Sequence, residues 1–221
     1  MKILIIGSTG RVGKLLVTHA LEKGHQVTAF ARNVEDYPFE HENLKLFQGD
    51  VLYPALIDVA MPGHDIVLSV IGIRQFKGPI TLLSTGMGHI IAAMKKHGLK
   101  RILTLTGAGI LQENEHELIM DSLGFPPNLQ NLSLDHRRVF HALQESGLDW
   151  TIVCPAFMTS GPKRSNLLVR ANYYPSRAMN QVSAEAVADF MTDEMIKNEY
   201  IGQRVGIAEG FEDEDELFPL S

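Results

Sequence analysis

The chain has 221 residues, 45% of them hydrophobic and 21% charged, which is typical of a globular protein and leaves room for one large domain. Its net charge of −6 disfavours a nucleic-acid partner, and no apolar run approaches the roughly 20 residues that span a membrane. The single cysteine, Cys154, excludes an intrachain disulfide and fits a reducing compartment, so we expect a cytoplasmic protein.

The first unit of the chain is predicted to be a strand, a tight turn and a helix. Residues 2–6 form an apolar run that ends at Gly7, as expected of a strand buried on both faces. From Arg11 to Lys23 apolar residues recur at helical spacing, and Gly24 follows as a stop signal.

The rest of the chain alternates between the same two patterns. Further strands are predicted at residues 26–31, 44–47, 65–70, 101–105, 150–153, 167–172 and 204–207. Helices are predicted at residues 54–60, 80–97, 135–145 and 183–197, the last with Ser183 as its N-cap. Because parallel strands need crossover connections, this alternation predicts an α/β fold, a doubly wound parallel sheet of the Rossmann type in a single domain over residues 1–221.

The segment 112–133 has the least regular pattern in the middle of the chain. It contains an acidic patch, three asparagines and the pair Pro126 and Pro127. Loops of this length inside compact domains often act as lids. Since it follows the strand at 101–105, it is expected at the carboxyl edge of the sheet, where ligands bind in this fold class, and we predict a lid over a cleft.

The turn between the first strand and the first helix, called here the glycine-rich turn, runs Gly-Ser-Thr-Gly-Arg-Val-Gly over residues 7–13. Gly7 would allow the sharp turn, Gly10 the close approach of a pyrophosphate and Gly13 the tight packing of the helix on the strand. The phosphates would then meet backbone amides and the positive end of the helix dipole. The expected cofactor-binding residues of this turn are Gly7, Ser8, Thr9, Gly10, Arg11 and Val12.

A nucleoside-triphosphate P-loop is the main alternative, because Gly13-Lys14 resembles its end. The glycine that such a loop requires falls on Ser8, and the position after Lys14 is Leu15 rather than a serine or threonine that could bind magnesium. The pattern therefore favours a dinucleotide.

The residues after the second strand indicate which dinucleotide is bound. An acidic residue there accepts the ribose 2′-hydroxyl of NAD, whereas an arginine accommodates the 2′-phosphate of NADP. Here the strand is followed by Arg32 and Asn33, with no carboxylate, and Arg11 offers a second positive charge. We predict NADP(H), with NAD(H) as the alternative.

Several motifs together resemble the atypical short-chain dehydrogenase/reductases of the NmrA-like and biliverdin-IXβ or flavin reductase kind. They are the glycine-rich turn, Gly49-Asp50-Val51, Gly72, and the run from Ser146 to Pro155. The resemblance implies that Asp50 and Val51 border the adenine. Further cofactor contacts implied by the resemblance are Val70, Ile71, Gly72, Thr106, Gly107, Pro155, Ala156 and Phe157. Arg74 and Phe157 would face the substrate.

Active short-chain dehydrogenases carry a tyrosine with a lysine four residues later, and this chain has no such pair. The positions of the two residues in the family fall on Leu132 and His136. A flavin or quinone can take its proton from water or a weak donor, so His136 and Thr106 become the candidate catalytic residues. In the biliverdin reductase branch a histidine stands where this chain has Phe157, which disfavours biliverdin as substrate.

These observations predict an NADPH-dependent reductase that transfers hydride to a flavin, quinone or similar planar acceptor. The alternative is a non-catalytic NADP(H)-binding redox sensor or regulatory protein of the NmrA-like kind, which the missing Tyr and Lys favour. The expected partner is a small-molecule acceptor, with no nucleic acid and no membrane. None of the nine histidines has the spacing of a metal motif, so no metal is expected.

Overall fold

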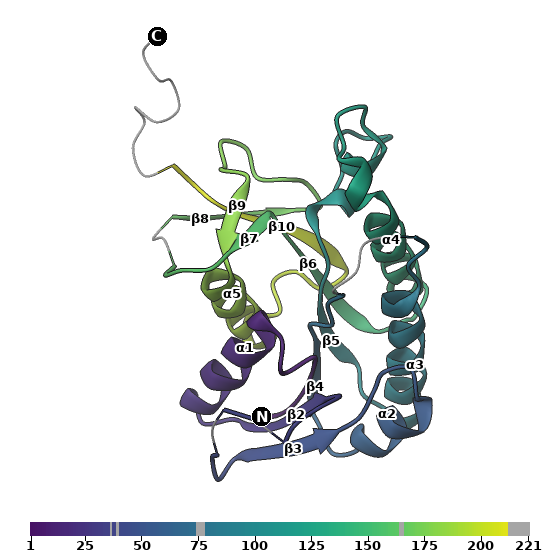
Figure 1. Ribbon diagram of the computed structural model, residues 1–221, viewed down its shortest axis with the longest axis vertical. Helices are drawn as coiled ribbons and strands as arrows, with labels where there is room; N and C mark the ends of the chain where they lie inside the picture. Colours follow the sequence, from purple (N-terminus) through teal and green to yellow (C-terminus); the bar gives the residue numbers. More distant parts are fainter. Residues whose placement is uncertain (36, 39, 74–77, 164–165, 212–221) are drawn as a thin grey trace.

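The computed structural model describes residues 1–35, 37–38, 40–73, 78–163 and 166–211. They form an eight-stranded sheet in the order β3-β2-β1-β4-β5-β6-β10-β8, with helices on both faces (Figure 1). The strand order reverses between β1 and β4, which is the switch point where doubly wound sheets bind ligands. The predicted α/β Rossmann architecture is confirmed.

Seven strands of this sheet are parallel and one is not. The strands are β1 Lys2–Ile6, β2 Gln26–Ala31, β3 Leu44–Gln48, β4 Ile66–Ser69, β5 Arg101–Leu105, β6 Asp149–Pro155, β8 Leu167–Ala171 and β10 Gln203–Glu209. β8 pairs antiparallel with β10, so the predicted parallel sheet carries one antiparallel strand at this edge. The described residues between β6 and β8 contain no helix, and without a crossover the chain runs back across the sheet in the opposite direction.

A second, two-stranded sheet was not predicted. It pairs β7 (Phe157–Thr159) with β9 (Gln181–Ser183) in parallel. Each strand has three residues, too few for an alternating pattern to be recognised in the sequence. Figure 1 shows the pair beyond the carboxyl end of β6, above α5.

The helices divide between the two faces of the large sheet (Figure 1). α1 (Arg11–Glu22) and α5 (Ala184–Lys197) cover one face, and α2 (Pro54–Ala60), α3 (Leu82–His97) and α4 (Gln130–Gln144) cover the other. Ser183 caps α5 as predicted, since its hydroxyl accepts a hydrogen bond from Ala186 N at 3.2 Å. None of the helices in the described ranges combines the length and apolar character needed to cross a bilayer.

The start of α3 is set by a residue from another helix. Asp135 of α4 is fully buried, and its carboxylate accepts hydrogen bonds from Leu83 N at 2.9 Å and from the Ser84 hydroxyl at 2.5 Å. This distant cap satisfies amides that a local N-cap would otherwise bind. The prediction that α3 begins at residue 80 was therefore two residues early.

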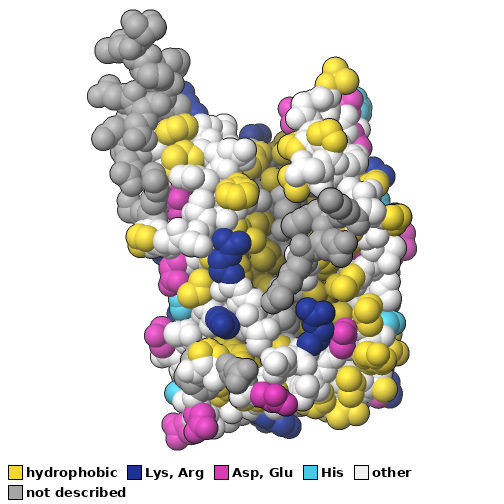
Figure 2. Space-filling view, in the orientation of Figure 1, with side chains coloured by type: hydrophobic (Ala, Val, Ile, Leu, Met, Phe, Trp, Pro, Cys, Tyr) yellow, Lys and Arg dark blue, Asp and Glu magenta, His cyan; other side chains and the backbone are white. Residues whose placement is uncertain are grey.

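The predicted lid, residues 112–133, is more regular than expected. Three short 3₁₀ turns, η1 (Ala108–Ile110), η2 (Ile119–Asp121) and η3 (Pro127–Leu129), lie in or next to it, and the last leads into α4 at Gln130 rather than at residue 135. Arg204 of β10 ties the segment down by donating to the carbonyl of Ile110 and to Gln112 Oε1. Figure 2 shows the molecule hollowed between this segment and the β7–β9 side, with hydrophobic side chains at the base.

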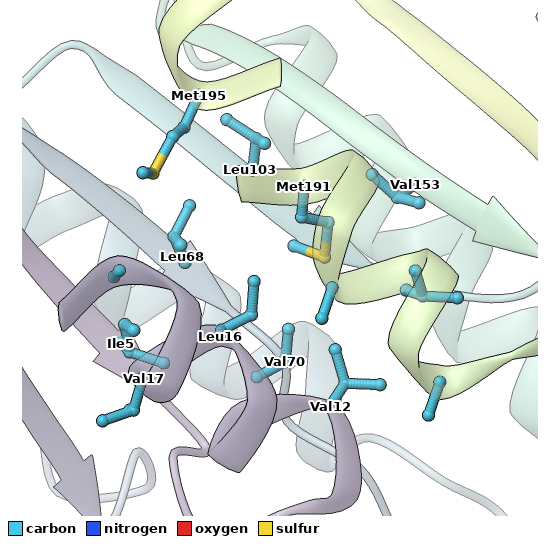
Figure 3. Close-up of a cluster of buried hydrophobic side chains, with 14 of the residues drawn as sticks. Ile5, Val12, Leu16, Val17, Leu68, Val70, Leu103, Val153, Met191 and Met195 are labelled. Carbon is cyan, nitrogen blue, oxygen red and sulfur yellow. The ribbon is translucent and has the colours of Figure 1, made fainter. Parts of the chain in front are cut away.

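The core beneath α1 fixes the position of the glycine-rich turn. Val12, Leu16 and Val17 of α1 are buried against strand residues and against α5, which contributes Met191 and Met195 (Figure 3). Burying side chains of this size stabilises the fold by roughly 1.5–3 kcal/mol each, before the loss of conformational entropy is subtracted. The first turn of α1 is thus held by packing rather than by its own cap, because Gly10 offers no side-chain hydrogen bond.

Candidate functional site

The glycine-rich turn is so tightly folded that two of its three glycines leave no room for a side chain. Gly7 has a φ of +91°, and a Cβ there would lie 2.7 Å from the carbonyl oxygen of Val70. A Cβ at Gly13 would lie 2.2 Å from the carbonyl oxygen of Gly7. These distances agree with the predicted roles of Gly7 in the sharp turn and of Gly13 in helix packing.

The first turn of α1 presents free amides. The amide of Gly10 donates to Gly7 O, and that of Lys14 donates to Gly10 O, both at 3.0 Å. Among the described residues the amides of Arg11, Val12 and Gly13 donate no hydrogen bond. Three free N–H groups at the positive end of a twelve-residue helix form a site for an anion such as a diphosphate.

Two side-chain hydroxyls, those of Ser8 and Tyr37, donate hydrogen bonds to backbone carbonyls in or next to the turn. The Ser8 hydroxyl is buried and donates to Phe30 O at 3.2 Å, so this predicted cofactor residue uses its side chain within the fold. Tyr37, which the sequence reasoning missed, donates from its hydroxyl to Ser8 O at 3.4 Å. Burial raises the pKa of Tyr37 to about 12, so the phenol stays protonated. Nothing near Tyr37 in the sequence indicates this contact, because it closes a 29-residue separation.

Arg32 follows β2 and its side chain is exposed. Its backbone carbonyl accepts a hydrogen bond from Gln48 Nε2 at 3.1 Å, which fixes the end of the strand. In the part of the chain that the structure describes, its guanidinium has neither an ion pair nor a hydrogen bond. The charge is therefore available to a ligand at the switch point.

The predicted adenine border lies between β3 and α3. Val51 is buried, and Gly86 of α3 leaves room for it, since a Cβ at Gly86 would lie 2.9 Å from Val51 Cγ2. The carboxylate of Asp50 accepts the amide of Leu52 at 3.0 Å and stabilises the local turn. Gly49 is required by the ring of Phe30, whose Cζ would be 2.4 Å from a Cβ there.

The residues after β4 lie beside the glycine-rich turn. Val70 is buried and its amide donates to Ile6 O at 2.8 Å, which places Val70 and Ile71 next to Gly7. Gly72 is open, because a Cβ added there would meet no described atom within 4 Å. Arg74, the predicted contact of an anionic substrate, lies outside the described residues.

Thr106 and His136 are brought together at the end of β5. With Ser69, Thr104 and apolar neighbours they line a small cavity of about 10 Å³, roughly the space of one water molecule. Thr106 Oγ1 lies 3.3 Å from the sulfur of Cys154, and burial raises the pKa of that thiol to about 12. Cys154 is thus a core residue with a protonated thiol.

His136 lies in the seventh position of α4, not near a helix start as predicted. Its ring packs under Gly107, where a Cβ would be 3.6 Å from Nδ1. Burial lowers the pKa of His136 to about 4, and the charge of Asp135 opposes that shift only in part. The imidazole is therefore neutral at pH 7 and suited to hydrogen bonding, which disfavours the role of proton donor expected from the sequence.

The chain from the end of β6 into β7 lies on the β7–β9 side of the molecule (Figure 1). Pro155 and Ala156 are buried, and Ala156 N donates to Ile207 O at 3.0 Å. Phe157 begins β7 and is 74% exposed. Arg11 Nη1 donates to Met158 O at 3.0 Å, so this arginine is turned toward β7, whereas the sequence suggested that it adds a charge beside Arg32.

One cluster of possible metal ligands lies outside this site, between α1 and α5. His19 Nε2 is 2.8 Å from Glu185 Oε1, and His19 Nδ1 is 3.3 Å from Asp189 Oδ1. The two carboxylates engage different ring nitrogens, so no single nitrogen faces both, as a shared metal would require. Lys163 also pairs with Asp189 at 2.5 Å, and we interpret the cluster as an ion-pair array.

Comparison with known protein families decides the nature of the turn. Residues 7–198 match the family described as NAD(P)H-binding. The chain belongs to the NAD(P)H-binding family. The match begins at the first glycine of the turn and extends to the end of α5, so it covers the switch point and both helical faces of the sheet.

A sequence relative and a solved structure of this NAD(P)H-binding protein cover most of the chain. The uncharacterized protein YwnB of Bacillus subtilis is 28% identical over 169 residues, which are 75% of this chain and 76% of YwnB. The oxidoreductase ylbE of Lactococcus lactis superposes with a TM-score of 0.79 at 25% identity, over 95% of this chain and 91% of that one. Several further curated relatives are matched over less than half of their own length.

A Streptococcus pneumoniae protein named for NADH-flavin reductase activity superposes with a TM-score of 0.79 at 24% identity, over 95% of this chain and 99% of that one. At this identity the likeness shows the Rossmann fold alone. The turn fits the dinucleotide of the family on its own geometry, because Gly7 and Gly13 allow a close approach of backbone that a Cβ would prevent, and the amides of Arg11, Val12 and Gly13 donate no hydrogen bond among the described residues.

Proposed function

We propose that this NAD(P)H-binding protein is a reductase that uses NADPH and transfers hydride to a flavin, a quinone or a similar planar acceptor. The observation that carries the proposal is that the candidate catalytic groups lining one small cavity at the end of β5, Thr106 and His136, are not acidic at neutral pH. An acceptor reduced there must take its proton from water, which flavins and quinones can do. When bound, NADPH supplies the hydride.

The residues that would hold the cofactor divide by the group they bind. The amides of Arg11, Val12 and Gly13 bind the diphosphate, since they are unused by the fold. The exposed guanidinium of Arg32 binds the 2′-phosphate, for which its planar fork of N–H donors is suited. This division supports NADPH over NADH.

Thr106 and His136 act by hydrogen bonding. The Thr106 hydroxyl is shared with the Cys154 sulfur and faces a cavity the size of one water molecule. The neutral imidazole of His136 lines the same cavity and can donate from one ring nitrogen and accept at the other. Together they can orient a water beside the acceptor without themselves changing charge.

A regulatory role is the second candidate, and one observation favours it. The positions that carry the tyrosine and lysine of active short-chain dehydrogenases hold Leu132 and the buried, neutral His136. A protein that binds NADP(H) without turnover needs no proton donor, so the same geometry suits a sensor of the NmrA-like kind.

Two measurements on the intact protein distinguish the reductase from the sensor. Steady-state NADPH oxidation with a panel of flavins and quinones tests turnover, and thermal shifts with NADP(H) and NAD(H) test binding. Turnover with at least one planar acceptor supports the reductase, whereas stabilisation by NADPH without turnover on any acceptor supports the sensor. No stabilisation by either dinucleotide would contradict both.

The preference for NADPH rests on Arg32 and has its own test. Arg32→Ala is expected to weaken NADPH binding by about ten- to a hundredfold, the value of a charge-assisted hydrogen bond, and to leave NADH binding nearly unchanged. NADH is the internal control, because it lacks only the 2′-phosphate. An unchanged ratio of the two dissociation constants would show that the 2′-phosphate assignment is wrong.

A further inference from the structure

The side chain of Arg11 joins two parts of the site that lie far apart in the sequence. Arg11 is the first residue of α1, and its Nη1 donates to Met158 O of β7 across 147 residues. This is the only polar contact of the guanidinium within the described part of the chain. A guanidinium carries five N–H donors in a planar fork, so most of its donors are unused by the fold.

The unused donors lie at the end of α1 that also presents free amides. Arg11 is exposed, and among the described residues no acidic side chain forms an ion pair with it. The positive charge of its guanidinium therefore adds to the amides of Arg11, Val12 and Gly13 at one helix terminus. A ligand bound by those amides must be an anion, and an arginine fork binds phosphate oxygens well.

The strand on the other side of the contact is weakly attached. β7 has three residues and pairs with the three residues of β9, not with the large sheet. It starts with the exposed Phe157, directly after Pro155 and Ala156. A hydrogen bond to Met158 O therefore restrains the strand that begins with Phe157.

We propose that Arg11 is a positioning residue: its free N–H groups bind the diphosphate of the dinucleotide while Nη1 holds Met158 O, so that binding of the diphosphate fixes β7 and Phe157. The proposal rests on the proposed function in that it needs a dinucleotide at the start of α1. It differs from the expectation that Arg11 supports the 2′-phosphate, because it assigns Arg11 to the part that NADPH and NADH share.

The first test compares dissociation constants of NADPH and NADH, measured by calorimetry on the full chain. Arg11→Ala is expected to weaken both dinucleotides by the same factor, about ten- to a hundredfold, whereas Arg32→Ala weakens NADPH alone. Arg11→Lys keeps the charge without the fork, so it should lose less affinity than Arg11→Ala. Because Arg11 is exposed, its variants should keep the fold, which their melting temperatures will verify.

The second test reads the link to β7 through hydrogen exchange of the amides of residues 157–160. Saturating NADPH should slow this exchange in the original protein and in Lys14→Ala, but not in Arg11→Ala. Lys14 is the matched control, since it is an exposed cation in the same turn of α1 and makes no hydrogen bond to β7 among the described residues.

The outcomes separate this proposal from the proposed function. If the original protein binds neither dinucleotide, the proposed function fails and the role of Arg11 fails with it. A different outcome overturns only the role of Arg11. In that outcome the original protein binds NADPH, and Arg11→Ala either binds both dinucleotides as tightly as the original protein does or still shows slower exchange at β7 when NADPH is added.

Discussion

The two ends of the candidate site differ in what they are made of. The glycine-rich turn binds through backbone: its shape comes from Gly7 and Gly13, and its donors are amides of one helix end. The proposed acceptor side, with Thr106, His136 and Phe157, consists of side chains carried by a strand end, a helix and a short extra strand. A site that is built from backbone groups can be encoded within seven consecutive residues. A site that is built from side chains depends on how segments far apart in the sequence pack together.

The largest expected effect comes from adding one methyl group to the turn. In Gly13→Ala the new Cβ would meet the carbonyl oxygen of Gly7 at 2.2 Å, and backbone on both sides cannot move aside cheaply. We expect a loss of about 3 kcal/mol in the free energy of unfolding and no measurable NADPH binding. The melting temperature should fall by roughly 6–12 °C for that loss in a chain of this size.

Gly88→Ala is the matched control for this prediction. Gly88 lies on the exposed side of α3, and a Cβ there would meet nothing within 4 Å. Alanine in a helix interior should raise the free energy of unfolding by about 0.5–1 kcal/mol relative to glycine. If Gly13→Ala has the same effect on stability and NADPH binding as Gly88→Ala, the turn does not bind through its backbone, and the two ends of the site do not differ in the way described.

This difference explains how far the sequence could predict the molecule. Local patterns predicted the strand–turn–helix unit, the order of the central elements, the cap at Ser183 and the tight glycine-rich turn, because each depends on neighbouring residues. Tyr37, Asp135 and Arg204 were missed, since each acts on a partner 29 to 94 residues away and no local pattern records it. The antiparallel edge at β8 was missed for the same reason.

His136 shows why chemistry at the acceptor side could not be inferred from residue type. The sequence offers a histidine with an ordinary pKa near 6.5, which is a fair proton donor at neutral pH. Packing of α4, positioned by the contact of Asp135 with α3, buries the ring and lowers its pKa to about 4. The same residue thus changes from an acid to a neutral hydrogen-bonding group.

The second prediction tests that burial through the pH dependence of stability. The pKa of His136 is lower in the folded chain than in the unfolded one, so as the pH falls below 6.5 the unfolded state takes up a proton first. Stability conferred by the neutral ring is complete above pH 6.5 and is lost toward pH 4. Between pH 7 and pH 5.5 this group should reduce the free energy of unfolding by about 1 kcal/mol.

Urea unfolding of the original protein and of His136→Gln at the two pH values isolates this effect. Other histidines titrate in both proteins, so only the difference in their pH dependence belongs to His136. The variant should lose about 1 kcal/mol less than the original protein on acidification. Equal losses would mean that the ring is accessible to water in the folded state, and the case for a proton from solvent would lose its main support.

The third prediction concerns Phe157, where the smallest effect on stability is expected. The side chain is 74% exposed, so Phe157→Ala should change the free energy of unfolding by less than about 0.5 kcal/mol. If its ring stacks on a planar acceptor in the hollow, removing it should raise KM for a flavin or quinone about two- to tenfold, the value of one aromatic contact. The dissociation constant of NADPH should change less, because the amides of the glycine-rich turn carry that binding.

Ile201→Ala, which removes an exposed apolar side chain on the turn between α5 and β10, controls for a general loss of surface hydrophobicity. An acceptor KM that is equal in both variants would show that Phe157 does not contact the acceptor.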